Sequence, residues 1–347
     1  MIFSKTLMHW YSNNKRILPW RETKNPYYIW LSEIILQQTQ VKQGLPYYES
    51  FVTSYPTVFD LANAEESDVL KLWQGLGYYS RARNLHASAK YIANVLNGVF
   101  PNTYKDLLKL KGVGDYTASA IASICFNEAT AVVDGNVYRA LSRYFGIDTP
   151  INSSKGQKEF KALAQELIDI KKPADFNQAI MEFGAIQCKP KNPECSACAF
   201  QNSCVAFSNN SVSDLPVKIK SAKAKKKYFN FLVFISEDGK TILERREGKG
   251  IWQNLYQFPL IETSEEAEFR SILAAIEKFE LLKDITFDLS LYNKDTIVHK
   301  LSHQHLHTKF WIINMNTLPV EGISLNKIRD YAVPILIGNF IEAFNFE

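Results

Sequence analysis

Four of the chain's five cysteines lie in one 17-residue stretch, CKPKNPECSACAFQNSC, with the spacing C-x6-C-x2-C-x5-C. Four closely spaced thiols in an intracellular chain are typical ligands of zinc or of an iron–sulfur cluster. A structural zinc site usually has two short cysteine pairs, whereas this stretch has a single C-x2-C pair. The spacing therefore favours a 4Fe–4S cluster over zinc, held by Cys188, Cys195, Cys198 and Cys204.

Two carboxylates are candidates for acid–base chemistry. If residues 28–42 form one helix, the helical neighbours of Glu33 are mostly apolar: Ile29, Trp30, Leu36 and Gln37. Apolar surroundings raise a carboxyl pKa, which suits a general acid, although a lone Glu on a helix is usually just solvated. Asp134 precedes Gly-Asn in AVVDGNVYRALSRYF, where its ordinary role would be to cap a helix.

A glycine turn stands between two helical patterns in LLKLKGVGDYTASAIASI, residues 107–124. Gly112 and Gly114 permit a tight turn that brings backbone N–H groups close to a ligand at the start of the second helix. Such a turn can hold a DNA phosphate without reading the base sequence. A plain turn between helices is the alternative.

The elements that must position these residues change character along the chain. Up to about residue 187, apolar residues recur at three- and four-residue spacing, which predicts helices. Residues 209–227 are polar and contain six lysines from Lys218 onward, as in an exposed linker. Beyond them, short runs such as FNFLVFIS and HTKFWIINM favour strands, and residues 264–280 favour a helix. The sequence thus predicts an all-α region, a linker and a smaller mixed α/β region.

The composition is that of a globular protein, 46% hydrophobic and 22% charged over 347 residues, with a net charge of +4. No apolar run approaches the length of a membrane-spanning helix, and the first residues lack the features of a secretory signal. We therefore expect a cytoplasmic protein with no membrane association, associated with the nucleoid in a bacterium. The small positive charge is compatible with a nucleic-acid partner.

The cysteine spacing, the glycine turn and the aspartate after it together resemble the endonuclease III superfamily of DNA repair glycosylases. Within it, SEIILQQTQV and LPWR resemble the adenine DNA glycosylase (MutY) family. The resemblance implies a helix-hairpin-helix at residues 107–121 and a 4Fe–4S cluster loop at residues 188–204. Lys111 stands where the family often has proline before the hairpin.

The resemblance assigns roles to residues of the catalytic half. It implies that Glu33 protonates the purine and that Asp134 faces the sugar, with Tyr116 and Asn136 in support. An endonuclease III lyase has lysine at the position of Tyr116, so the chain is expected to be monofunctional, without strand cleavage through a Schiff base. Implied DNA or substrate contacts are Trp20, Arg21, Leu36, Gln38, Tyr78, Gly112 and Gly114; core packing is the alternative for Trp20 and Leu36.

The C-terminal part, from about residue 227, resembles the Nudix-like domain of the same family. Its helix lacks the R-E-x-x-E-E arrangement that a working Nudix hydrolase uses to hold magnesium, so nucleotide hydrolysis is not expected. VHKLSHQHLHTKF matches the family's 8-oxoguanine loop and implies that Ser302 and His303 read the lesion, although Leu301 replaces the usual aromatic residue. A zinc site at His303, His305 and His307 is the weaker alternative.

The prediction is a multidomain monomer: an all-α helix-hairpin-helix glycosylase region with its cluster loop at 1–206, a basic linker at 207–226, and an α+β Nudix-like 8-oxoguanine-recognition domain at 227–347. Its expected partner is double-stranded DNA with an 8-oxoguanine:A or G:A mispair. Two rivals remain: an endonuclease III-type lyase acting on oxidised pyrimidines, and a noncatalytic iron–sulfur DNA-binding protein or one whose C-terminal domain alone acts on nucleotides.

Overall fold

The computed structural model describes residues 2–220, 223–278, 282 and 285–346. Its contacts divide the chain into two compact units. The helical unit comprises residues 1–63 and 84–220, and the mixed unit comprises residues 64–83 and 221–347. The expected fold class, helical first and mixed α/β afterwards, is confirmed. The predicted linker at 207–226 includes Ser221 and Ala222, which lie outside the described residues, as do Phe279 and Glu280 of the predicted helix at 264–280.

The helical unit is made of helices joined by short connections. In chain order they are α1 (Ile2–Asn14), η1 (Pro19–Arg21), α2 (Pro26–Ile35), α3 (Val41–Ser54), α4 (Val58–Asn63), most of α6 (Ser80–Asn94), α7 (Tyr104–Leu107), α8 (Asp115–Phe126), α9 (Gly135–Phe145), α10 (Ser154–Leu167), α11 (Pro173–Glu182), η2 (Phe183–Gln187), η3 (Cys195–Ala197), η4 (Gln201–Ser203) and α12 (Val205–Ser208).

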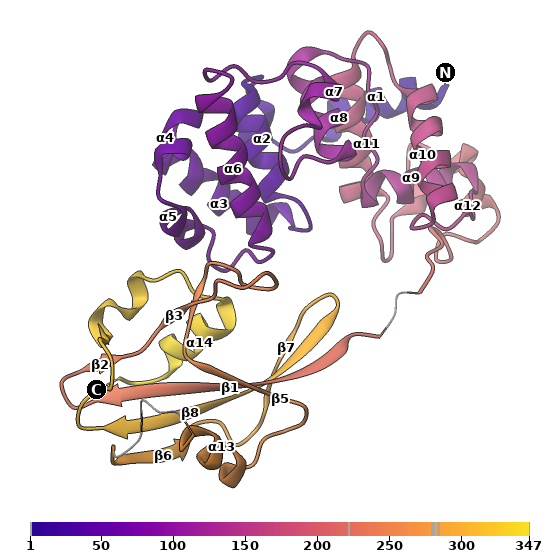
Figure 1. The fold of residues 1–347 in the computed structure, drawn as a ribbon. Coiled ribbons are helices and arrows are strands. Elements are labelled where there is room, and N and C mark those ends of the chain that lie inside the picture. Colours follow the sequence, from indigo (N-terminus) through magenta and orange to yellow (C-terminus); the bar gives the residue numbers. More distant parts are fainter. Residues whose placement is uncertain (1, 221–222, 279–281, 283–284, 347) are drawn as a thin grey trace. The chain divides into compact units, whose positions relative to one another are not determined.

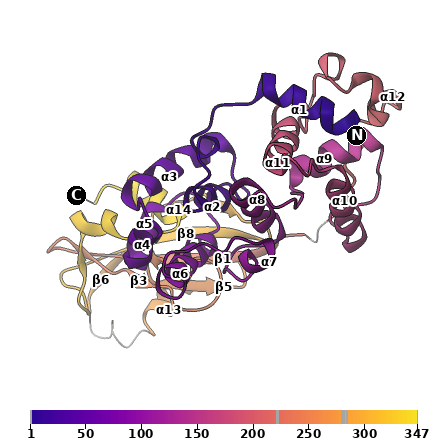
Figure 2. The same ribbon diagram turned by 90° about the horizontal axis from the view of Figure 1, so that it is seen from above.

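These helices form two groups, which can be followed in both ribbon views (Figures 1 and 2). The first helix, α1, lies with α9 to α12, although they are far apart in sequence, whereas α2, α3 and α4 lie with α6. Helix α8 contacts both α2 and α11 and so joins the two groups. Its sequence, DYTASAIASICF, is rich in alanine and serine, and these small buried residues let other helices pack closely on several of its faces.

The helix expected across residues 28–42 is interrupted, which corrects that prediction. Helix α2 begins at the N-cap Asn25, whose side chain accepts a hydrogen bond from the Tyr27 backbone N–H, and it ends at Ile35. Gln38 then has a φ of 56°, which no helix residue adopts, and α3 starts only at Val41. Gln37 is therefore not a helical neighbour of Glu33.

The glycine turn lies where the sequence places it, between α7 and α8. Helix α7 ends at Leu107, so the residues just after it belong to the turn and not to a first helix. Gly112 has a φ of +78°, and a Cβ atom there would lie 2.8 Å from the Cβ of Asn84, so both backbone conformation and space call for glycine. Gly114 is the N-cap of α8.

The mixed unit is built around a sheet. Its elements are α5 (Glu66–Leu72), the start of α6, β1 (Lys225–Ser236), β2 (Lys240–Thr241), β3 (Glu244–Arg245), β4 (Tyr256–Gln257), β5 (Leu260–Thr263), α13 (Phe269–Ile276), β6 (Phe287–Leu291), β7 (Ile297–Lys300), β8 (Gln304–Met315), β9 (Ile323–Ser324), η6 (Leu325–Asp330) and α14 (Ile335–Ala343).

Strands β1 and β8 are the long central pair of this sheet, as Figure 1 shows. They run parallel in register from Lys225 opposite Gln304 to Ser236 opposite Met315. Strand β5 pairs antiparallel with β1, while β6 and β7 pair antiparallel with different parts of β8. Because successive side chains of a strand point to opposite faces, Leu232 and Trp311 lie on the face that packs against α13. On the other face, Phe310 stacks on Phe340 of α14 with ring centroids 4.1 Å apart.

Residues 64–83 belong to the mixed unit although the chain passes through the helical unit before and after them. The Lys71 ammonium donates to the backbone carbonyls of Arg329 and Tyr331. The Tyr79 hydroxyl donates to the carbonyl of Val333, 3.3 Å away. These contacts attach the segment to the chain that leads into α14.

In the part of the chain that the structure describes, no helix is both long and apolar enough to cross a membrane.

Candidate active site

A cavity of about 750 Å³ in the helical unit gathers the predicted catalytic residues. Its walls come from η1, α2, α8, α11 and the residues that open α9, so it lies between the two helix groups. Seven of the predicted residues line it: Trp20, Arg21, Glu33, Leu36, Tyr116, Asp134 and Asn136.

Glu33 is a buried acid on α2, with only 8% of its surface exposed. Burial raises its pKa to about 7, and the nearby Asp134 carboxylate adds to the rise. A hydrogen bond with Tyr116 and the charge of Arg21 act in the opposite direction. Burial is the largest of these effects, so Glu33 can carry a proton near neutral pH.

Asp134 is both the cap of α9 and a wall of the cavity. Its Oδ1 accepts hydrogen bonds from the backbone N–H groups of Asn136 at 2.9 Å and Val137 at 2.8 Å. Its Oδ2 accepts one from the Asn136 side chain at 2.7 Å. Burial raises the pKa of Asp134, and these hydrogen bonds to the charged form oppose the rise. The pair thus contains a proton carrier, Glu33, and a carboxylate held by donors that favour its charge.

Tyr116, on α8, lines the same cavity as Glu33 and Asp134. Its hydroxyl donates to the thioether sulfur of Met181 at 3.0 Å and is hydrogen-bonded to Glu33. Burial raises its pKa well above 10, and the Glu33 and Asp134 carboxylates raise it further. The hydroxyl is therefore neutral at ordinary pH.

An ion cluster around Glu182 forms another wall of the cavity. Glu182 of α11 is 1% exposed and accepts from Arg16 at 2.7 Å and from Arg21 at 2.8 Å. Burial alone would raise the pKa of Glu182, but the hydrogen bonds from both arginines outweigh it and lower the pKa to about 2. The Nε of Arg21 is buried without a hydrogen-bond partner. Six residues before Cys188, Glu182 has no distinguishing motif in the sequence.

Three of the predicted DNA or substrate contacts, Leu36, Gln38 and Gly114, line a wider adjoining cavity of about 2060 Å³. It shares Glu33 and Asp134 with the first cavity. Gln38 is exposed in its left-handed turn. Gly112 lines neither cavity, but its carbonyl accepts from the Gln37 side chain at 3.4 Å, which joins the glycine turn to the turn after α2.

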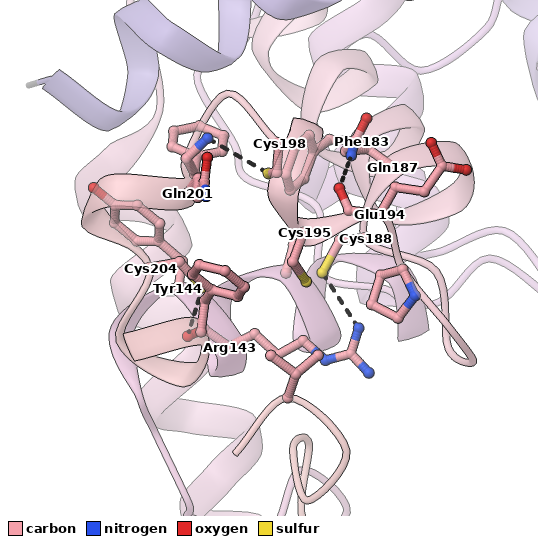
Figure 3. Close-up of a pocket in the computed structure, with 15 residues that line it drawn as sticks. Arg143, Tyr144, Phe183, Gln187, Cys188, Glu194, Cys195, Cys198, Gln201 and Cys204 are labelled. Carbon is pink, nitrogen blue, oxygen red and sulfur yellow. Dashed lines mark hydrogen bonds between the residues drawn. The ribbon is translucent and has the colours of Figure 1, made fainter. Parts of the chain in front are cut away.

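The four clustered cysteines surround a third cavity, of about 430 Å³, shown in Figure 3. Arg143 of α9 supports the loop: it donates to Cys188 Sγ at 3.5 Å and to the carbonyl of Lys189 at 2.7 Å. Among the described residues, no group of three or more His, Cys, Asp or Glu is set to hold a metal ion. The four thiols share one cavity.

The remaining predicted residues belong to the mixed unit. The hydroxyls of Tyr78 and Ser302 are hydrogen-bonded at 2.8 Å, and His303, which follows Ser302 in sequence, is exposed. Tyr78 has a φ of 49°, between Gly77 at +75° and the start of α6. His303 precedes β8 while His305 and His307 lie within it, so the three histidines of the alternative zinc site do not share one strand.

Comparison with known proteins gives two family matches. Residues 31–169 match the HhH-GPD superfamily base excision DNA repair protein model, and residues 230–343 match a NUDIX domain. The adenine DNA glycosylase of Buchnera aphidicola subsp. Baizongia pistaciae (strain Bp) is 35% identical over 316 residues, covering 90% of this chain and 86% of that protein. The Homo sapiens adenine DNA glycosylase is 45% identical over 213 residues, 59% of this chain and 39% of that protein.

Among solved structures, a thermostable thymine-DNA glycosylase is 32% identical with a TM-score of 0.56, covering 60% of this chain and 96% of that one. An endonuclease III in a non-covalent DNA complex has a TM-score of 0.53 at 20% identity, over 60% of this chain and 95% of that one. At this low identity, the similarity to endonuclease III shows only that the two proteins share a fold.

Proposed function

Because this chain belongs to the adenine DNA glycosylase family, we propose that it excises adenine mispaired with 8-oxoguanine and, more weakly, with guanine. The observation that carries the proposal is the pairing of Glu33 and Asp134 on one cavity, with the pKa of Glu33 raised to about 7. An acid that is protonated near neutral pH beside a carboxylate held by hydrogen-bond donors is the arrangement that cleavage of a glycosidic bond requires.

The reaction begins with extrusion of adenine from the duplex, because the reacting atoms are not accessible within the base stack. Glu33 protonates the base at N7 and makes it a better leaving group. The sugar then develops positive charge, which ionised Asp134 stabilises or traps covalently. Tyr116 and Asn136 hold the two acids in place through the hydrogen bonds described above, and Glu33, now deprotonated, activates the water that completes hydrolysis.

The cavity wall supports adenine as the base. On its Watson–Crick edge, adenine presents an amino donor beside a ring-nitrogen acceptor, which leaves N7 for Glu33. Glu182 and Arg21 line one wall of the cavity and are proposed to supply the complementary acceptor and donor. Trp20 and Leu36 supply apolar surface against the ring. The ion cluster with Arg16 keeps Glu182 charged, so the acceptor persists across neutral pH.

The four cysteines fit a 4Fe–4S cluster, which we propose as the structural cofactor. The donor set is four thiols around one cavity, and Arg143 places positive charge against them. Bound there, the cluster would hold the loop of residues 188–204 in place. Broad absorbance near 400 nm in the purified protein would identify the cluster, while a colourless protein that contains zinc would reject it.

Double-stranded DNA is the proposed partner. The turn at Gly112 and Gly114 opens α8, whose first backbone N–H groups suit a phosphate. Gln38 and Tyr78 are proposed to enter the helix at the lesion, and Ser302 and His303 to read 8-oxoguanine. We propose three parts: a glycosylase region at 1–206, a basic linker at 207–226 and a recognition domain at 227–347, acting as a monomer.

A single-turnover assay on an 8-oxoguanine:A duplex tests the proposal. We expect release of adenine by the intact protein and none by Glu33→Gln, which should still bind the duplex. Turnover by Glu33→Gln would remove Glu33 as the acid. Borohydride trapping on a damaged-pyrimidine duplex would reveal the lyase rival, and duplex binding without release of any base would favour the noncatalytic one. Nucleotide hydrolysis alone would assign the activity to the C-terminal domain.

A further inference from the structure

The hydroxyl of Tyr116 lies between two side chains from different helices. On one side is Glu33 of α2, to which it is hydrogen-bonded. On the other is Met181 of α11, whose sulfur lies 3.0 Å from the hydroxyl oxygen. Met181 is partly exposed and lines the same cavity as both partners. It is next to Glu182 in sequence but takes no part in that ion cluster.

The hydrogens that these groups can donate decide which group is the donor in each hydrogen bond. A tyrosine hydroxyl has one hydrogen to donate, and a thioether can only accept. With Glu33 protonated, its carboxyl donates to the Tyr116 oxygen and Tyr116 donates to Met181, so every group is satisfied. With Glu33 ionised, the Tyr116 hydrogen must turn toward the carboxylate, and the sulfur loses its donor.

We propose that Met181 is a positioning residue that holds the Tyr116 hydrogen toward itself, which leaves the Tyr116 oxygen free to accept the proton of Glu33. The inference deepens the proposed function and rests on Glu33 as its acid. Met181 thereby favours the protonated form of Glu33, which donates to the base. Once that proton has gone, the Tyr116 hydroxyl turns its hydrogen toward the Glu33 carboxylate. A thioether suits this role because it is a weak acceptor that a carboxylate readily outcompetes.

The other groups that face Glu33 act through charge. Arg21 favours its ionised form and Asp134 disfavours it. The Cys125 thiol is neutral, since burial and the Glu33 carboxylate raise its pKa to about 12. Further charged groups around the two cavities are Arg16, Lys42, Asp115, Arg139 and Glu182. Met181→Leu removes the sulfur at similar volume and changes none of these charges.

The experiment is the pH dependence of single-turnover excision on an 8-oxoguanine:A duplex. In Met181→Leu, we expect the midpoint of the alkaline decline to move down by about half a pH unit while the rate on the acid side of that midpoint stays within about twofold. Met8→Leu, on α1 away from the cavity, is the matched control and should leave the midpoint in place. An unchanged midpoint in Met181→Leu, or an equal loss of rate at every pH, would overturn the proposal.

Two further measurements separate this inference from the proposed function. Carbon-13 NMR of glutamate-labelled protein, with Glu33→Gln to assign the signal, follows the Glu33 titration without turnover. A lower midpoint in Met181→Leu supports the inference even if no adenine is released, and an equal midpoint rejects it. In a Tyr116→Phe background, Met181→Leu should cause no further shift, because the hydroxyl that connects the two residues is gone. A shift of the same size there would contradict the inference.

Discussion

The guanidinium of Arg139 joins the cysteine loop to Asn136. Its Nε donates to the backbone carbonyl of Cys188 at 2.7 Å, and its Nη2 donates to Oδ1 of Asn136 at 2.9 Å. The amide of Asn136 in turn donates to Asp134. Arg139, on the first turns of α9, therefore orients the amide that holds the carboxylate. The same guanidinium is anchored to the cysteine loop through the Cys188 carbonyl.

Arg139→Gln should weaken excision more than DNA binding. The shorter neutral side chain cannot make both charge-assisted hydrogen bonds, each of which contributes about 1.5–3 kcal/mol. We expect the single-turnover rate to fall about tenfold or more, with a smaller change in duplex affinity. Lys5→Gln, which removes an exposed positive charge from α1, is the control. Equal losses in both variants would mean that overall charge, and not this bridge, is responsible.

The pH dependence of excision should be bell-shaped. Glu33 must be protonated to act as the acid, so the rate should fall as the pH rises through about 7. Asp134 must be ionised, so the rate should fall again in acid, at a pH above the usual range of an aspartate because burial raises its pKa. Single-turnover rates across this range measure both limbs. A rate that stays constant through neutral pH up to pH 9 would contradict the role of Glu33.

Glu33→Gln should stabilise the protein in a pH-dependent way. The folded state binds the Glu33 proton more tightly than the unfolded chain, since the pKa rises from 4.5 to about 7. The free energy of unfolding therefore decreases as the pH rises between these values, by about 3 kcal/mol in total. A neutral glutamine avoids this loss. Urea unfolding should show a larger advantage for the variant at pH 8 than at pH 5, and a gain independent of pH would point to packing instead.

Substitutions at Ser302 and His303, the residues proposed to recognise 8-oxoguanine, should alter the preference for the base opposite adenine more than the rate of excision. The double variant Ser302→Ala with His303→Ala should narrow the preference for 8-oxoguanine:A over G:A. Tyr78→Phe keeps the ring but loses the hydroxyl that is bonded to Ser302, so we expect a smaller change in the same direction. Relative excision rates on the two duplexes provide the measurement, and an unaltered ratio in the double variant would remove the assignment.

Much of the fold could be predicted from the sequence because helical spacing and strand alternation are local signals. The catalytic cavity could be predicted only in part. Glu33 and Asp134 stand in recognisable motifs, whereas Glu182 and Met181 come from a helix of ordinary amphipathic pattern. Their partners are more than 60 residues away in the chain, and no local spacing reveals such contacts. The break after α2 was missed because Gln38 is not a residue type that marks a turn.

The segment from Ala64 to Arg83 has a practical consequence for dissecting this protein. A fragment cut at the lysine-rich stretch would keep Lys71 and Tyr79 but lose the carbonyls that they bond, and the separate C-terminal piece would lack both donors. Each half produced in this way would lose these hydrogen bonds. Expressing the two pieces together, so that they can reassociate, should recover more soluble material than either piece alone.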